Sequence, residues 1–336
     1  MIENFSIGGE FYGRKFFQRN KILNKFKSGS WTLSGRSAFE LIIKNKPELW
    51  KKTIYLPIYN CPSIYKIAKK YFKKVIFYDL SENFYPKIKK YKKNSVLMLV
   101  NYFGHKSNLV LDKNLIVIED LSHSLLDKLK LKKKRFYFLS LRKFGIFNLG
   151  GWTNYEHNNI RNLEVNFLES FRKKKLKYIS TKKKCLQTEN KLVDLFKKEE
   201  KKIFKKNYCI SKNQIKSFLK MPEKKIISIR KLNYKLLKKN IKRGFSKIIY
   251  KKNETPLFFF LKFSSLNQRN NARNFFSKRN IYCPIFWDLT SFNLSKFPNA
   301  KKFSQNMLAV PLDHRLSIRD TLYVIKNIKE YDFKRY

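Results

Sequence analysis

A lysine follows directly after a strongly apolar stretch of the sequence. Segment 138–144 reads Phe-Leu-Ser-Leu-Arg-Lys-Phe and carries Ser140 and Lys143. An amine that is partly buried just past a strand can have a lowered pKa and act as a nucleophile. The alternative is one more surface lysine, because the chain has 76 Lys and Arg residues in all. The Ser-x-x-Lys spacing alone does not decide between the two.

Two adjacent carboxylates end another apolar stretch. Residues 116–118 are Ile-Val-Ile, and Glu119 and Asp120 follow them. In an open α/β sheet, carboxylates at the C-terminal end of a strand face the usual ligand crevice. The alternative is an acidic turn that only ends the strand, although the chain has just 24 acidic residues.

A third segment is typical of a helix that begins with small residues. Residues 34–40 read Ser-Gly-Arg-Ser-Ala-Phe-Glu, with Gly35, Arg36 and Ser37 at the predicted start. Backbone N–H groups at such a start bind phosphate, and an arginine adds positive charge. An ordinary helix cap is the competing interpretation.

Together these three segments supply the parts of a pyridoxal-phosphate site. Asp120 precedes Lys143 by 23 residues (143 − 120). The lysine would form a Schiff base with the cofactor, and the acid would keep the pyridinium nitrogen protonated. The helix start and Ser140 would hold the 5′-phosphate. The four histidines and four cysteines show no metal-ligand spacing and no C-x-x-C, so no metal site is predicted.

The elements that must position these residues alternate between strands and helices. Apolar, β-branched and aromatic runs predict strands at 53–58, 74–79, 96–102, 115–119 and 136–141. Helical patterns lie between them at 37–45 and 63–72. This rhythm predicts an α/β fold with a mostly parallel central sheet that helices cover.

The rest of the chain predicts a different organisation. Residues 158–243 are basic and helical in pattern, with Ser211 as a helix cap and Pro222 in the first turn of the next helix. Beyond them, strands are predicted at 257–263 and 281–286 and helices at 271–278 and 317–327. We therefore expect a large α/β cofactor-binding domain at 1–206, a helical connector at 207–242 and a small α+β domain at 243–336.

The composition bounds the classes of function. The 336 residues have a formal net charge of +52, which suggests a nucleic-acid partner. However, lysines occur in nearly every segment, as expected of a drift toward AT-rich codons, so nucleic acid is the less favoured partner. No apolar run approaches the length of a membrane span, and no signal peptide is recognisable. We expect a cytoplasmic protein with reduced thiols.

Seven segments, taken in order, resemble the DegT/DnrJ/StrS family of pyridoxal-phosphate-dependent aminotransferases. In the first half of the chain, the family motifs are S-G-T-x-A at 34–38, V-P-x-x-T-F at 55–61, P-V-F-V-D-I at 75–80, V-H-L-Y-G-Q at 99–105 and V-I-E-D-A-A-Q/H at 117–123. In the second half they are N-Y-R-M-S at 207–211 and F-P-x-A…L-x-L-P at 297–312. The resemblance covers most of the chain and implies the fold-type-I architecture of aspartate aminotransferase.

The resemblance also implies roles for individual residues. Lys143 would bind the cofactor covalently and later shuttle a proton, and Asp120 would pair with the pyridinium nitrogen. His123 would pack against the ring or form a hydrogen bond near the ring oxygen. The phosphate would be bound by a set of residues in and around the helix start: Gly35, Arg36, Ser37 and Ser140.

Other implied roles fall on residues that depart from the family pattern. Asn207 would reach the phosphate of the neighbouring subunit of a homodimer. Cys61 stands where the family places an aromatic ring on the cofactor, and Tyr59 or Tyr102 would substitute for that ring. Phe138 replaces a serine five residues before the lysine. Arg36 and Cys209 replace a threonine and an arginine.

The predicted function is amino transfer from an amino acid, glutamate by expectation, to a keto group. By resemblance the acceptor is a nucleotide-linked keto-sugar for surface glycan biosynthesis. Two alternatives stay open. One is a catalytically inactive relative with a regulatory or glycan-assembly role, and the other is a basic nucleic-acid-binding protein.

Overall fold

A computed structural model gives the fold of this chain. It describes residues 7–8, 26, 28–88, 90–107, 114–127, 131–132, 135–144, 149–157, 161–162, 208–241 and 250–333. All statements about structure below refer to these residues.

The centre of the fold is an eight-stranded sheet with the order β2-β9-β8-β7-β6-β3-β4-β5. The strands in this order are Ser30–Thr32, Gly151–Thr153, Arg135–Ser140, Ile116–Asp120, Val96–Val100, Thr53–Pro57, Lys74–Leu80 and Pro86–Lys87. Strands β8, β7, β6, β3 and β4 are mutually parallel. The outer strands β2, β9 and β5 pair antiparallel with their neighbours. The predicted mostly parallel α/β sheet is confirmed.

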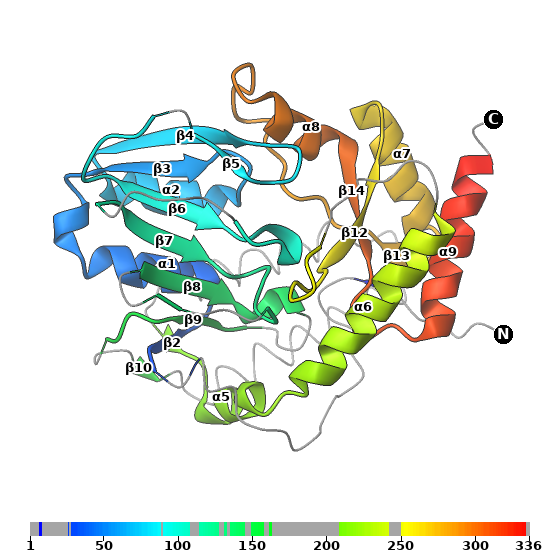
Figure 1. Cartoon of the computed structure of the whole chain (residues 1–336), viewed down its shortest axis with the longest axis horizontal. Helices are drawn as coiled ribbons and strands as arrows, with labels where there is room; N and C mark the ends of the chain where they lie inside the picture. Colours follow the sequence, from blue (N-terminus) through cyan, green and yellow to red (C-terminus); the bar gives the residue numbers. More distant parts are fainter. Residues whose placement is uncertain are drawn as a thin grey trace.

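Helices α1 (Gly35–Lys44) and α2 (Pro62–Tyr71) pack against each other and against this sheet. Every residue of β6 is buried, as its unbroken apolar sequence predicts for a strand covered on both faces. Figure 1 shows the arrows of β6, β7 and β8 pointing toward β12 and α6. The C-terminal ends of the central strands therefore face the C-terminal part of the chain.

The C-terminal part has its own small sheet and its own buried cluster. Strands β12 (Phe258–Lys262) and β14 (Met307–Pro311) pair antiparallel. The helices here are α5 (Lys212–Leu219), α6 (Glu223–Asn240), α7 (Leu266–Ser277), α8 (Pro298–Asn306) and α9 (Ile318–Phe333). Helices α6, α7 and α9 pack beside one another (Figure 1) and enclose an apolar cluster that includes Leu237, Phe276 and Val324.

Helix α8 connects this part to the large sheet. The carboxylate of Asp79 in β4 accepts hydrogen bonds from the backbone N–H of Asn299 at 3.1 Å and of Ala300 at 3.0 Å. A carboxylate at the start of a helix satisfies its free N–H groups and complements its dipole. Two of the segments that carry the family resemblance, 75–80 and 297–300, are thus in direct contact.

Several predicted elements differ in extent. The predicted helical stretch 158–243 contains two strands, because β10 (Arg161–Asn162) and β11 (Tyr208–Cys209) pair in parallel. The predicted strand 281–286 is only β13 (Ile281–Tyr282), which pairs with β1 (Ile7–Gly8). Ser211 does cap α5, with a capping box to Gln214. The predicted domain boundaries at 206 and 242 stay predictions.

Strand 96–102 ends earlier than predicted, at Val100. The 3-10 turn η3 (Tyr102–Gly104) follows it, and Phe103 there has φ = 54°. None of the described helices is long and apolar enough to cross a membrane. Over the same residues, no group of three or more His, Cys, Asp or Glu residues is placed to bind a metal ion.

Candidate active site

The register of the sheet separates the two adjacent carboxylates. Asp120 lies opposite Val100 and Phe138, whereas Glu119 lies opposite Leu99 and Tyr137. Successive side chains of a strand point to opposite faces.

Glu119 has a full set of partners on its own face. It accepts 2.8 Å and 3.1 Å hydrogen bonds from Asn101 Nδ2 and Arg135 Nη1. Asp120 shares a face of the sheet with Phe138, which packs on Phe39 of α1, whereas Glu119 points to the opposite face.

Asp120 is a buried carboxylate at the C-terminal end of β7. Its Oδ1 accepts a 2.8 Å hydrogen bond from the N–H of Ser122. Burial raises the pKa of Asp120 to about 6, and the bonds from Ser122 and the positive charge of Lys143 oppose that rise. A carboxylate in such a position favours a cationic partner, because that partner would stabilise its charged form.

The start of α1 lies directly against the end of β8. The N–H of Ser140 donates to Ser122 Oγ at 3.0 Å. A Cβ placed on Gly35 would lie 2.9 Å from the Cβ of Ser140. Any side chain at position 35 would therefore push the helix away from β8. The sequence motif at 34–37 and the motif at 138–143, far apart in the chain, meet at this point.

The first turn of α1 carries a side-chain cap. Ser34 caps the helix, and its Oγ accepts from the N–H of Ser37 at 3.1 Å. The start of a helix carries partial positive charge, and this one lies directly beside Ser140. This arrangement suits an anion beside Ser140.

Lys143 lies just past β8, in the 3-10 turn η4 (Leu141–Phe144). Its Nζ is 5.2 Å from the centroid of the Phe286 ring. The ring of His123 lies against the same Phe286 ring, with 5.6 Å between centroids. The positive charge of Lys143 acts to lower the pKa values of both Asp120 and His123.

His123 is buried between aromatic rings. Its ring stacks on Phe103, with 4.9 Å between centroids, and on Trp287, with 5.7 Å. Burial and the charge of Lys143 hold the pKa of His123 well below its usual value. Its Nδ1 has no hydrogen-bond partner among the described residues. A neutral imidazole with one unused nitrogen can pack against a ring and bond to a group on it.

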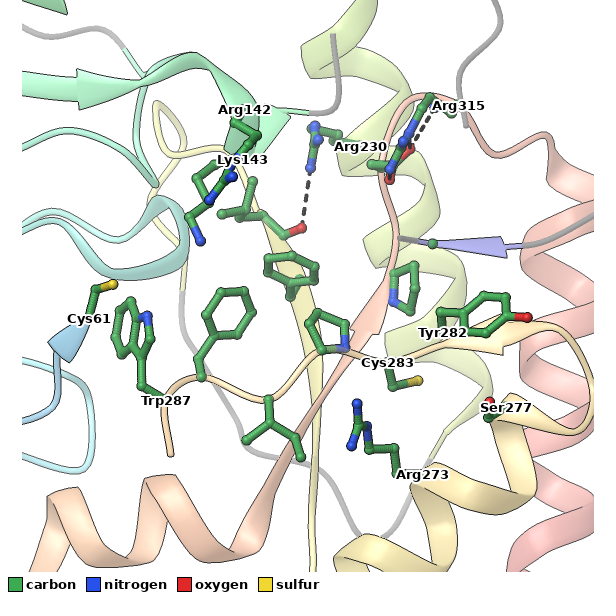
Figure 2. Close-up of a pocket in the computed structure, with 18 of the residues that line it drawn as sticks. Cys61, Arg142, Lys143, Arg230, Arg273, Ser277, Tyr282, Cys283, Trp287 and Arg315 are labelled. Atoms are coloured by element: carbon green, nitrogen blue, oxygen red, sulfur yellow. Dashed lines mark hydrogen bonds and ion pairs between the residues drawn. The ribbon is translucent and has the colours of Figure 1, made fainter. Parts of the chain in front are cut away.

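A cavity of about 610 Å³ opens beside Lys143 (Figure 2). Its lining includes Cys61, Arg142 and Lys143 from the first part of the chain, and many residues that follow Arg230. Asp120, His123 and the start of α1 are not among the lining residues. Of Lys143, Asp120 and His123, Lys143 is therefore the residue that reaches the cavity.

Neither tyrosine predicted to substitute for the ring at Cys61 is among the residues that line the cavity. Tyr59 and Tyr102 are fully buried, the Tyr102 hydroxyl donates to the Tyr59 carbonyl, and Tyr59 packs edge-to-face on Trp287 with 5.1 Å between centroids. Figure 2 shows Trp287 beside Cys61 at the cavity, where neither tyrosine lies. The sequence analysis missed Trp287, and the only signal for it was a pair of large aromatic residues, Phe286 and Trp287, after a short strand. Asn207 lies outside the described residues.

No protein-family model and no curated protein sequence matches the chain. Solved structures do match. A protein named as a sugar aminotransferase, Spr1654 from Streptococcus pneumoniae, has a TM-score of 0.63 and 14% identity, over 92% of this chain and 87% of that chain. It has also been solved in PLP and PMP forms.

Two further structures are similar over comparable lengths. DesV of S. venezuelae, in complex with a ketimine intermediate, has a TM-score of 0.62 and 13% identity, over 97% of this chain and 90% of that chain. A DegT DnrJ EryC1 StrS aminotransferase from Brucella abortus has a TM-score of 0.59 and 11% identity, over 91% and 86%. The predicted architecture is confirmed, and the chain has the fold of the DegT/DnrJ/EryC1/StrS sugar aminotransferases.

Proposed function

We propose that this chain is a pyridoxal-phosphate-dependent aminotransferase. The observation that supports the proposal best is that Lys143 lines the cavity, while its Nζ and the ring of His123 lie 5.2 Å and 5.6 Å from the same Phe286 ring. The similarity in fold to sugar aminotransferases supports it. The overall reaction transfers an amino group from an amino acid to a keto compound, which yields a keto acid and an amino compound.

The described residues fit the cofactor in three respects. The positive end of α1, with Arg36 and Ser37, and the hydroxyl of Ser140 would bind its phosphate. The buried carboxylate of Asp120 would accept a hydrogen bond from the protonated ring nitrogen, and this positive partner would offset the penalty for burying its charge. The unused Nδ1 of His123 would bond to a polar group of the ring.

The cofactor, when bound, supplies a carbonyl that condenses with amines and a ring that withdraws electrons from the substrate. The residues of this chain do the rest. Lys143 Nζ would hold the cofactor and, once free, would move a proton as general base and acid. Asp120 would keep the ring nitrogen protonated. His123 and Trp287 would orient the ring.

The acceptor in this proposal is a nucleotide-linked keto-sugar, the donor is glutamate, and the product serves surface glycan biosynthesis. The names of the similar structures as sugar aminotransferases support the sugar. The homodimer, the contribution of Asn207 to the neighbouring subunit and the cytoplasmic location stay predictions.

The first experiment is chemical trapping of the cofactor. The full chain is incubated with pyridoxal phosphate, reduced with borohydride, digested and mapped by mass spectrometry. The proposal expects the added mass on Lys143. It also expects loss of the violet absorption band in Lys143→Ala, whereas the exposed-surface control Lys235→Ala should keep it. A band and an adduct that persist on another lysine would overturn the assignment.

The second experiment separates an enzyme from an inactive relative with the same fold. Glutamate is added to the loaded protein without any keto acceptor. An aminotransferase loses the violet band and releases one keto acid for each site. A chain that binds the cofactor but leaves glutamate unchanged would support the inactive alternative.

A further inference from the structure

A short segment of the C-terminal part, 254–257, contacts the two loops that follow strands β6 and β7. These loops carry Phe103 and His123, whose rings stack with 4.9 Å between centroids and 19° between planes. The last residue of the segment, Leu257, lines the cavity beside Lys143, and β12 begins at the next residue. The segment therefore connects the cavity lining to the two stacked rings.

Glu254 binds the loop that follows β6. Its side chain is 2% exposed, and its Oε2 lies 3.1 Å from Nδ1 of the buried His105. Its Oε1 accepts a 3.0 Å hydrogen bond from the N–H of Lys106. Its Oε2 also accepts a 2.9 Å hydrogen bond from the N–H of Lys251, within the C-terminal part. One buried carboxylate thus joins the loop to the segment through three contacts.

The carboxylate of Glu254 is in its charged form. Burial would raise the pKa of Glu254, but the hydrogen bonds from His105 and two backbone N–H groups outweigh burial and hold the pKa below its usual value. A charged carboxylate only accepts hydrogen bonds, so Nδ1 of His105 is the donor. The His105 ring also packs edge-to-face on Tyr85, with 4.8 Å between centroids. Two partners therefore fix the orientation of this ring.

The backbone of Phe103 is strained and depends on the same segment for support. Its φ is 54°, in the left-handed region that a bulky residue adopts only where the surrounding structure imposes it. The carbonyl of Phe103 accepts a 3.0 Å hydrogen bond from the N–H of Leu257 and a 3.2 Å one from the hydroxyl of Tyr250. The position of the Phe103 ring therefore depends on contacts from the C-terminal part.

Thr255 contacts both loops at once. A Cβ placed on Gly104 would overlap the carbonyl oxygen of Thr255, so the two backbones lie directly against each other. On its other side, the N–H of Thr255 donates to Oδ1 of Asp127 at 2.8 Å. Asp127 ends the two turns that follow β7 and contain His123. The segment thereby sets the spacing between the loop of Phe103 and the loop of His123.

We propose that Glu254 is a positioning residue of the active site. Through His105 and the backbone of Lys106 it holds the loop after β6, and it thereby keeps the ring of Phe103 stacked on His123. The inference rests on the proposed function, because it takes His123 as a neighbour of the cofactor ring. Glu254 does not line the cavity, so it acts on the orientation of the bound cofactor only through these residues.

The alternative is a contact that only stabilises the fold, and a matched pair of variants separates the two. In Glu254→Gln the side chain keeps its size but has one acceptor oxygen for three donors, so the loop loses part of its support. Asp79→Asn is the matched control. Asp79 is also a buried carboxylate that accepts two backbone hydrogen bonds between the large sheet and the C-terminal part, and it does not line the cavity.

The first readout is the NMR signal of the His123 ring in the full chain at pH 7.5, without cofactor. The chain has four histidines, and the variant His123→Gln identifies the signal. A proton that lies over the face of an aromatic ring resonates upfield, so the signal reports the stacking on Phe103. Glu254→Gln should move it toward the position of a free neutral imidazole, whereas Asp79→Asn should leave it in place.

Two variants at His105 test the same contact from the other side. His105→Gln keeps an N–H donor for the carboxylate, whereas His105→Phe keeps a ring and loses the donor. The His123 signal should stay in place in His105→Gln and shift in His105→Phe. This pair leaves Glu254 intact, so it decides the question even where Glu254→Gln does not fold.

The second readout is the bound cofactor. Pyridoxal phosphate gives a visible circular-dichroism band when a protein holds it in one orientation. Glu254→Gln should lower the amplitude of this band, and the affinity for pyridoxal phosphate should fall about 2- to 13-fold, the range of one stacked aromatic contact. Asp79→Asn should keep both the band and the affinity.

The inference is overturned if Glu254→Gln and His105→Phe leave the His123 signal and the dichroism band unchanged, or if Asp79→Asn changes them equally. It can fail separately from the proposed function. If the adduct forms on Lys143 and the His123 signal does not depend on Glu254, the positioning role fails and the aminotransferase stands. If no adduct forms, the aminotransferase proposal fails, and a shifted His123 signal then shows only that Glu254 holds the loop.

Discussion

The indole of Trp287 lies parallel to the imidazole of His123. Their planes meet at 6°, and their centroids are 5.7 Å apart. His123 is buried, whereas Trp287 is half-buried and lines the cavity beside Cys61. The centroids of His123, Phe103 and Trp287 form a triangle with sides of 4.9, 5.7 and 6.5 Å, and Trp287 is the ring of the three that lines the cavity. It supplies an aromatic surface at the place where Cys61 has none.

We expect Trp287→Ala to weaken binding of pyridoxal phosphate. A stacked aromatic pair contributes about 0.5–1.5 kcal/mol beyond the area that it buries, which corresponds to about a 2- to 13-fold loss of affinity. Trp287→Phe keeps a ring and should keep most of the affinity. Equilibrium dialysis of the cofactor measures both variants.

The control for this prediction is Trp50→Phe. Trp50 is 37% exposed, and its ring packs on Tyr71, remote from the cavity lining. The Trp50→Phe variant should leave the affinity for pyridoxal phosphate unchanged. Equal affinities in Trp287→Ala and the unaltered chain would show that the ring does not contact the cofactor.

Asp120 gives a prediction about stability and pH. Burial raises the pKa of Asp120 to about 6 when no cofactor is bound. Its pKa in the folded state therefore exceeds its pKa in the unfolded state. Protonated Asp120 contributes fully to the stability of the folded state below about pH 4, and this contribution is lost as the pH rises through 6. A shift of about two pKa units corresponds to about 3 kcal/mol.

Asp120→Asn removes the charge that must be buried at neutral pH. Without cofactor, the variant should be more stable than the unaltered chain at pH 7.5, by up to about 3 kcal/mol, and nearly equal to it at pH 4. Urea unfolding at both pH values measures this difference. The same variant should bind pyridoxal phosphate poorly. Glu48→Gln, at an exposed carboxylate, is the control, and an identical pH dependence in the two variants would refute the prediction.

Gly35 tests the contact between α1 and β8. In Gly35→Ala the new methyl group would lie 2.9 Å from Ser140 Cβ and 3.1 Å from Ser140 N, so the helix start must move. Overpacking of this kind costs about 1–3 kcal/mol of unfolding free energy. Cofactor affinity should fall as well, because the N–H groups of the first turn move with the helix.

The double variant Gly35→Ala/Ser140→Gly identifies the cause. It removes the Cβ that the new methyl group meets, and stability should recover in part, since the contact with Ser140 N stays. Chemical unfolding of the single and double variants measures this coupling. If the second change gives no recovery, the clash with Ser140 is not the reason for the loss.

The sequence predicted the central sheet well because each strand has a distinct apolar pattern. Strands β3, β4, β6, β7 and β8 all lie within a residue or two of the predicted ranges. The elements that were missed or shortened are held by partners remote in the chain. Strand β13 pairs with β1, more than 270 residues away, and no local pattern specifies such a pairing.

The candidate site shows the same limit. Lys143, Asp120 and the start of α1 were found because each follows or begins a predicted element, and the parallel register then brings them together. Glu119 and Asp120 were not distinguishable until the alternation of β7 placed them on opposite faces. Trp287 was missed because its position depends on how the C-terminal part packs against the large sheet.

Asp313 provides the last prediction. It is 8% exposed, and its Oδ1 accepts from the N–H of Arg315 at 2.9 Å and from Arg315 Nε at 2.8 Å. Burial would raise the pKa of Asp313, but Arg315, Arg230 and His314 together outweigh burial and hold it well below its usual range. The stabilisation is therefore present above about pH 4 and is lost as the pH falls.

Asp313→Asn breaks the buried ion pair between Asp313 and Arg315. Breaking a buried ion pair on one side costs about 3–5 kcal/mol, so we expect a loss of this size at pH 7 and a smaller one at pH 3, by urea unfolding. The double variant Asp313→Asn/Arg315→Met replaces the stranded cation with an apolar chain and should recover much of the loss. Asp288→Asn, at an exposed carboxylate, should have a much smaller effect. If Asp313→Asn is as stable as the unaltered chain at pH 7, the ion pair with Arg315 does not stabilise the fold.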